Sequence, residues 1–148
     1  MKKIVLIVFC AFLSLGASAQ LVKPITWSYY GKKINQTEAI LYIKAKLDKG
    51  WHVYAQNIKS EPMRLKFNYT PSKDFALIGK TTQPKPILKY DKVVQMQLAY
   101  FENEVVFTQK IKLNKPSTTV RAKVEFMVCN ETSCLPADEV LMNIPVKP

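Results

Sequence analysis

The chain has 148 residues, a hydrophobic fraction of 48% and a formal net charge of +11. This length fits one domain with a hydrophobic core and leaves little room for a second. The lysines are dispersed and the only arginines are Arg64 and Arg121, whereas a phosphate-binding surface usually needs clustered arginines. We therefore expect no nucleic-acid partner. Solvated strand faces explain most of the charge, with an acidic partner or an anionic membrane surface as the alternative.

Residues 1–19 have the pattern of a secretory signal peptide. The segment begins with two lysines after Met1, continues with an apolar stretch over 4–15 and ends in a small-residue cleavage site at Ala17-Ser18-Ala19. The apolar stretch is short for a membrane span, and no other segment reaches about 18 consecutive apolar residues. We therefore expect an exported domain over residues 20–148 with no transmembrane span in the mature chain.

Period-two alternation of apolar and polar residues dominates the rest of the chain and predicts strands. In chain order, the predicted strands cover residues 25–30, 37–47, 51–55, 64–69, 75–78, 93–101, 105–113, 120–128 and 140–146. Turn-forming residues separate them at 48–50, 70–72, 84–86, 102–104 and 114–116. No apolar run has a convincing helical spacing. Many short strands without crossover helices predict an all-β fold, an immunoglobulin-like antiparallel β-sandwich.

Cys129 and Cys134 are the two cysteines of the predicted mature chain, because Cys10 lies in the signal segment. They therefore form a pair by default. Four residues separate them, too many for a Cys-x-x-Cys helix and few enough for a hairpin. A disulfide that closes so short a loop stabilises a fold by only about 2 kcal/mol in the chain-entropy model. Spacing leaves two functions open, a permanent structural bond or a bond that exchanges.

The strand pattern also predicts the surroundings of the two thiols. If the 120–128 strand continues without a bulge, Cys129 shares a face with Lys123 and Glu125, opposite the apolar residues. Neither a helix amino terminus nor an adjacent histidine is evident around the cysteines, and Glu125 and Glu131 oppose ionisation. We therefore expect a disulfide on the polar side of a hairpin, whose reduced form reacts slowly until a partner docks.

Soft side chains permit a third class of function, copper binding. Met127, Cys129, Cys134 and His52 include the ligand types that Cu(I) prefers, but their spacing is not diagnostic of a metal site. We therefore predict no metal and no cofactor.

Four segments carry a resemblance to a known family, most specifically the cysteine hairpin. They are Lys49-Gly50-Trp51-His52-Val53-Tyr54, Lys89-Tyr90-Asp91, residues 105–110 and residues 124–136. Together they resemble the amino-terminal periplasmic domain of the thiol:disulfide interchange protein DsbD, and the likeness runs from about residue 25 to residue 146. The resemblance implies an immunoglobulin-like domain in the periplasm that acts as a component of a protein-disulfide reductase.

The resemblance also implies partners. In the family, the domain accepts electrons from a redox domain attached to a membrane-embedded carrier. It passes them to oxidised periplasmic proteins, including disulfide isomerases and cytochrome c maturation factors. Because the family carries a transmembrane section and a thioredoxin-like domain after this module and the chain ends at Pro148, we expect thioredoxin-like periplasmic partners and a membrane electron transporter on a separate chain. The alternative is an exported binding or structural module whose disulfide is permanent.

Residue roles follow from the same resemblance. Cys129 and Cys134 match the exchanging pair, and the family pattern assigns attack on the partner to Cys134 and resolution to Cys129. His52 and Tyr54 match positions near the active site; the alternatives are an ordinary strand histidine and a core or sheet-edge aromatic residue. In the family an aromatic loop covers the disulfide, and Tyr90 in the corresponding region is the candidate cap.

Overall fold

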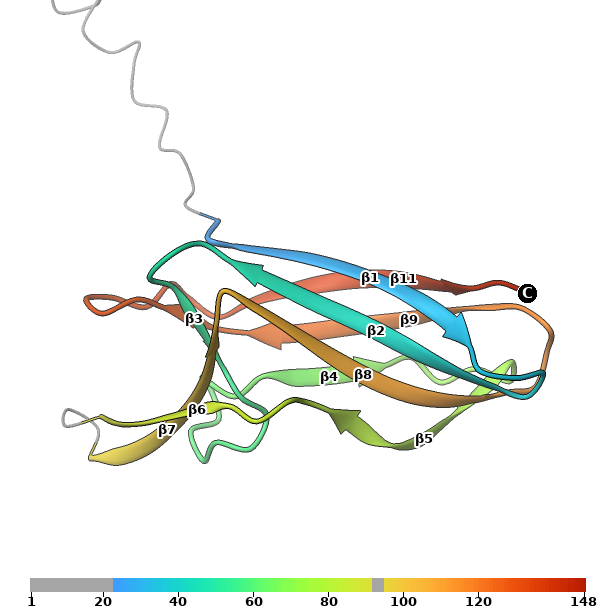
Figure 1. The fold of residues 1–148 in the computed structure, drawn as a ribbon, viewed down its shortest axis with the longest axis horizontal. Helices are drawn as coiled ribbons and strands as arrows, with labels where there is room; N and C mark the ends of the chain where they lie inside the picture. Colours follow the sequence, from blue (N-terminus) through green and yellow to red (C-terminus); the bar gives the residue numbers. More distant parts are fainter. Residues whose placement is uncertain (1–22, 92–94) are drawn as a thin grey trace, which may run out of the picture.

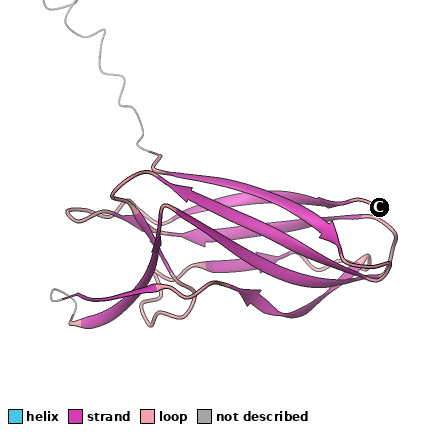
Figure 2. Ribbon diagram, in the orientation of Figure 1, coloured by secondary structure: helices cyan, strands magenta, loops and turns pink. Residues whose placement is uncertain are grey.

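The computed structural model describes residues 23–91 and 95–148, so the predicted signal peptide lies outside the described residues. All regular structure in the described part is β (Figure 2). No helix in these two ranges is long and apolar enough to cross a membrane. The strands are β1 (Ile25–Lys33), β2 (Glu38–Leu47), β3 (His52–Tyr54), β4 (Lys66–Tyr69), β5 (Phe75–Thr82), β6 (Ile87–Asp91), β7 (Met96–Glu102), β8 (Glu104–Leu113), β9 (Thr118–Phe126), β10 (Val128–Cys129) and β11 (Asp138–Val146).

Two antiparallel sheets, β1-β2-β8-β5 and β11-β9-β4, form the layers of a sandwich. Aromatic side chains pack between the layers: the ring centroids of Phe67 and Phe107 lie 5.0 Å apart, and those of Trp27 and Phe126 5.2 Å. Alternating buried and solvent-facing positions along β2 and β8 supply much of the core. The predicted immunoglobulin-like antiparallel β-sandwich is therefore confirmed.

Strands β1 and β11 adjoin at one edge of the sandwich. Here Gly31 approaches the opposite backbone so closely that an added Cβ would lie 2.7 Å from the Pro145 carbonyl oxygen and 2.7 Å from Cγ2 of Val146. A hydrogen in place of a side chain is what permits this approach. The glycine therefore allows the edges of the two layers to meet.

A third sheet, β10-β3-β7-β6, extends from the end of the sandwich that lies away from the carboxyl terminus (Figure 1). The chain leaves β2 for β3 near Gly50 (φ 84°), and β7 passes into β8 through Asn103 (φ 60°). Gly and Asn are the residues that most readily adopt these left-handed conformations. Because β2 pairs with β8 and β3 with β7, the two turns bend one paired ribbon out of the sandwich into the third sheet.

One predicted strand end is wrong, and one strand is missing from the prediction. The strand predicted over 120–128 ends at Phe126, and Val128–Cys129 pair with β3 instead of continuing beside β11. Val128 is buried in this arrangement, as it would be in an unbroken strand, so the apolar alternation does not reveal the change. Strand β6 was not predicted, because it lies at a sheet edge with its apolar Leu88 and Tyr90 exposed. The predicted start of the 93–101 strand falls outside the described residues, and β7 begins at Met96.

Candidate functional site

A disulfide joins Cys129, at the end of β10, to Cys134 across a short hairpin loop, with their Cα atoms 4.0 Å apart. The two cysteines differ in exposure. Cys129 is only 1% exposed, whereas Cys134 belongs to the exposed residues of the hairpin. An incoming group can therefore reach Cys134 far more easily than Cys129.

The burial of Cys129 contradicts the expectation that this cysteine lies on the polar side of an unbroken strand. Met127 separates β9 from β10, and after it the chain pairs with a different sheet. Val128 and Cys129 are both buried, at 3% and 1% exposure, although neighbouring residues of one regular strand point to opposite faces. The buried or exposed face of Cys129 therefore cannot be predicted by extending the alternation of β9 past Met127.

Backbone and side-chain hydrogen bonds shape the hairpin loop independently of the sulfur bond. Oδ1 of Asn130 accepts hydrogen bonds from the backbone N–H groups of Thr132 (2.9 Å) and Ser133 (2.8 Å). The Asn130 N–H donates to the Ser133 carbonyl (2.9 Å), and the Leu135 N–H donates to the Val128 carbonyl (2.9 Å). Side-chain bonds of this kind stabilise turns. The loop therefore has contacts that can hold its shape when the disulfide opens.

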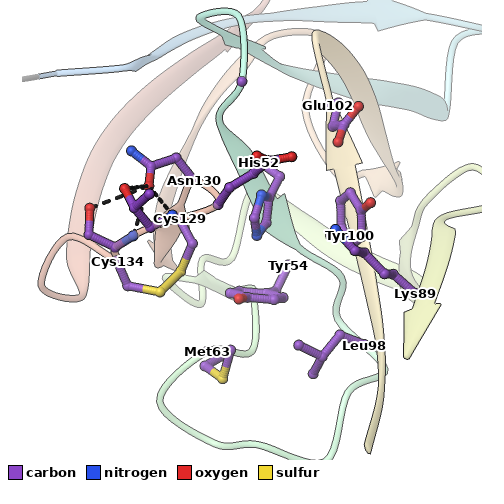
Figure 3. A pocket seen from close by; sticks show the side chains of 14 residues that line it. His52, Tyr54, Met63, Lys89, Leu98, Tyr100, Glu102, Cys129, Asn130 and Cys134 are labelled. Carbon is purple, nitrogen blue, oxygen red and sulfur yellow. Dashed lines mark hydrogen bonds between the residues drawn. A yellow bond between two sulfur atoms is a disulfide. The ribbon is translucent and has the colours of Figure 1, made fainter. Parts of the chain in front are cut away.

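The disulfide lies in a cleft of about 580 Å³ (Figure 3). Besides hairpin residues 129–134, the lining residues are Gly50, His52 and Tyr54 from β3 and the turn before it, Met63, Lys89 of β6, and Leu98, Tyr100 and Glu102 of β7. The β7 members alternate along the strand and therefore share one face. The third sheet thus forms a wall beside the disulfide.

His52 lies opposite Cys129 in the β10–β3 ladder, although the two are far apart in the chain. The expectation that no histidine is adjacent to the cysteines is therefore wrong. The His52 imidazole contacts the rings of Tyr54, at a centroid distance of 5.3 Å, and Tyr100, at 4.7 Å. Burial lowers the pKa of His52, the Glu102 carboxylate opposes this shift, and the Lys89 ammonium adds to it. These causes favour a largely neutral imidazole at neutral pH.

The acidic surroundings of the pair also differ from expectation. Glu131 lines the cleft, as does Glu102, which the sequence pattern places in a turn. Glu125 instead lies on β9, where its carboxylate forms an ion pair with Lys123 (2.8 Å) that lowers the pKa of Glu125. Glu102 and Glu131 are therefore the carboxylates of the cleft lining.

The structure brings Cys129, Cys134, His52 and Tyr54 together around one cleft. Tyr90 does not line this cleft; it is 60% exposed on β6, and the neighbouring Lys89 lines the cleft in its place. Its assignment as a cap remains a prediction. Sequence reasoning missed Tyr100 and Glu102, although alternation from Leu98 along β7 would have placed both on one face.

Of the four residues considered for copper, Cys129, Cys134 and His52 line the cleft and Met127 does not. A different methionine, Met63, is in the lining. Within residues 23–91 and 95–148, no group of three or more His, Cys, Asp or Glu side chains is placed to hold a metal ion.

One family model covers most of the chain. The family model described as "Thiol:disulfide interchange protein DsbD, N-terminal" matches residues 20–145. No curated protein sequence matches the chain.

Solved structures of low sequence identity share the fold. The N-terminal periplasmic domain of ScsB from Proteus mirabilis is similar with a TM-score of 0.59 and 16% identity, over 86% of this chain and 50% of that one. The reduced N-terminal domain of DsbD from Neisseria meningitidis gives 0.58 and 12%, over 90% and 95%. The N. meningitidis complex between the DsbD and PilB N-terminal domains gives 0.55 and 11%, over 86% and 88%. The chain thus spans half the length of the ScsB chain that it matches.

Proposed function

Because the chain belongs to the family of the N-terminal domain of the thiol:disulfide interchange protein DsbD, we propose that it passes electrons to oxidised periplasmic proteins through Cys129 and Cys134. The observation that carries the proposal is the unequal exposure of the two cysteines. Cys134 is accessible at the hairpin, while Cys129 is 1% exposed and lines the cleft. One sulfur can meet a partner and the other is kept for the intramolecular step.

The exchange has two halves. To load the domain, a partner thiolate attacks Sγ of Cys134, the bond between Cys134 and Cys129 breaks, and the electron pair leaves on Sγ of Cys129. The second thiolate of the same partner then attacks the partner sulfur of the mixed disulfide, which releases the reduced domain. To unload it, the Cys134 thiolate attacks an oxidised partner, and Cys129 resolves the mixed disulfide. Two electrons and two protons are transferred to the partner in each complete cycle.

The partners in this proposal are thioredoxin-like periplasmic proteins and a membrane electron transporter on a separate chain. The solved complex of a DsbD N-terminal domain with a PilB N-terminal domain supports protein partners for domains of this fold. Removal of residues 1–19 as a signal peptide would place residues 20–148 in the periplasm as one domain. The domain would then work as a component of a protein-disulfide reductase.

The reduction potential of the Cys129–Cys134 bond tests the proposal. Mature protein equilibrated with defined glutathione buffers should show a potential between about −180 and −270 mV, the range of exchanging disulfides. The fraction of reduced protein can be measured by mass spectrometry after thiol alkylation. A potential below about −300 mV would instead identify a permanent bond in a binding or structural module.

A further inference from the structure

Cys129, His52 and Glu102 occupy one row across three neighbouring strands. Cys129 of β10 is the cross-strand partner of His52 of β3, and His52 is the cross-strand partner of Glu102 of β7. Directly opposed residues in antiparallel strands have Cβ atoms about 4.5–5.5 Å apart and lie on the same face. All three line the disulfide cleft. The row therefore joins a cysteine of the disulfide, an imidazole and a carboxylate along one face of the third sheet.

Aromatic packing holds the imidazole on this face. Tyr54 lies two residues after His52 on β3, and its ring meets the imidazole nearly edge-on, at an interplanar angle of 87°. Tyr100 of β7 packs against the imidazole from the neighbouring strand, at 47°. Figure 3 shows His52, Tyr54 and Tyr100 on the side of the sheet that faces the disulfide. The ring is therefore held beside the cysteine pair by contacts that do not depend on the redox state.

The charged and titratable groups around the imidazole come from every element of the cleft. Glu102 on β7 favours the imidazolium, Lys89 on β6 disfavours it, and the hairpin adds the carboxylate of Glu131. The phenols of Tyr54 and Tyr100 and the sulfurs of Cys129 and Cys134 complete the set. Burial, the largest effect on His52, lowers its pKa, so that a neutral ring is available to accept a proton.

We propose that His52 exchanges a proton with Cys129 during thiol–disulfide exchange, with Glu102 as a positioning residue; this inference rests on the proposed function. Before Cys129 leaves, the imidazole takes a proton from solvent, which the Glu102 carboxylate favours. When Cys129 leaves as a thiolate, this imidazolium gives the proton to Sγ of Cys129 and becomes neutral. When Cys129 resolves a mixed disulfide, the neutral imidazole takes that proton, and the thiolate attacks Sγ of Cys134. The partner sulfur then leaves with the electron pair, and the disulfide forms again.

The unmodified protein offers a direct test, because His52 is the only histidine in the sequence. Its Cε1–H resonance, followed by NMR against pH in protein without a histidine tag, should titrate in one step in the oxidised form. In the reduced form it should show a second step as the neighbouring thiol ionises, because coupled groups titrate as a pair. The C129S variant under reducing conditions is the control and should return to one step. Identical curves in the oxidised and reduced wild-type protein would overturn the inference.

Kinetics test the role in the reaction. Reduction of the oxidised protein by dithiothreitol should slow by about 100-fold in H52A at pH 7, a usual effect of losing a general acid or base. Free imidazole should restore part of the rate in H52A and leave wild-type protein unchanged, a rescue that loss of packing alone would not produce. An H52A rate within twofold of wild type, or a slow rate that imidazole does not raise, would contradict the proton-exchange role.

The two proposals can fail separately. A reduction potential below about −300 mV together with a two-step His52 titration would overturn the proposed function and keep the pairing of imidazole and thiol. A potential in the exchanging range with a one-step titration would keep the function and remove His52 from it.

Discussion

Cys134 is the more exposed of the two cysteines. Cys129 is 1% exposed, in a strand that pairs with β3, whereas Cys134 lies among exposed hairpin residues. Attack on a disulfide needs access along the line of the sulfur–sulfur bond, so the exposed atom is the preferred target. The attacking role that the family resemblance implies for Cys134 remains a prediction.

Single-cysteine variants test these roles. C129A keeps the exposed thiol and should form a stable mixed disulfide with a thioredoxin-like protein that lacks its own resolving cysteine. C134A keeps the buried thiol and should trap at least tenfold less, because the incoming sulfur cannot approach it. Non-reducing gels would measure both, with the double variant as the background. Equal trapping by the two single variants would remove the distinction between attacking and resolving sulfurs.

Residue types showed which side chains could do chemistry, and the cross-strand register showed which of them meet. His52 and Cys129 lie in distant segments, and only the β3–β10 pairing places them together. Alternation along β7 places Glu102 on the face of Leu98 and Tyr100, but only the β3–β7 register places it opposite His52. Long-range register is therefore the information that the sequence pattern lacks at this site.

At the scale of single strands, side-chain hydrogen bonds join β5 to β8 in its own sheet and to β4 in the opposite layer. The hydroxyl of Thr81 donates a hydrogen bond to Oε1 of Gln109 (3.0 Å), which is 1% exposed on β8, and lies 3.0 Å from the Tyr69 hydroxyl. The register of β5 on β8 is irregular between Ile78 and Thr82. Nε2 of Gln109 donates to the Ile78 carbonyl (3.2 Å) there, so the glutamine satisfies a backbone group where the ladder is disturbed.

This network predicts an alkaline limit to stability. Burial raises the pKa of Tyr69 to about 12. Because the unfolded chain releases this proton near pH 10, the contribution to stability is complete below pH 10 and is lost as pH rises to about 12. Between pH 9 and 12, the unfolding free energy of wild type should therefore fall by up to about 2 kcal/mol more than that of the Y69F variant. Urea unfolding at both pH values would measure the difference, and equal losses would contradict it.

Strand prediction succeeds where alternation separates buried from exposed residues, as in β2 and β8. It fails at β10, because one intervening residue, Met127, allows the chain to change sheets while Val128 stays buried. It fails at β6, because an edge strand with exposed apolar side chains shows no buried stripe. These two strands border the site, so the elements least visible in the sequence are those that build the cleft.

At the scale of the whole molecule, a sandwich supports a smaller sheet that carries the candidate site. The sandwich could be predicted, since its length, alternation and turns agree on one architecture. Its closure depends on Gly31, which lies against Pro145 and Val146. The site extends from the end of this support on a ribbon continuous with β2 and β8.

The Gly31 contact predicts how the molecule responds to overpacking. G31A would place a methyl group 2.7 Å from the Pro145 carbonyl oxygen and should reduce the unfolding free energy by about 1–3 kcal/mol. K32A, at the next and exposed position of β1, is the matched control and should change stability by no more than about 0.5 kcal/mol. Urea denaturation would compare them, and equal stabilities of G31A and K32A would show that β1 and β11 can separate without cost.

The hydrogen bonds that Asn130 makes within the hairpin have a consequence for the proposed electron transfer through the domain. Because they can keep the loop in shape after the sulfur bond opens, we expect the oxidised and reduced forms to present nearly the same backbone to a docking protein. A partner that binds two forms equally shifts neither population. Donors and acceptors of electrons would then compete for one surface, and the net direction of flow would follow their relative potentials and concentrations instead of a preference for one form.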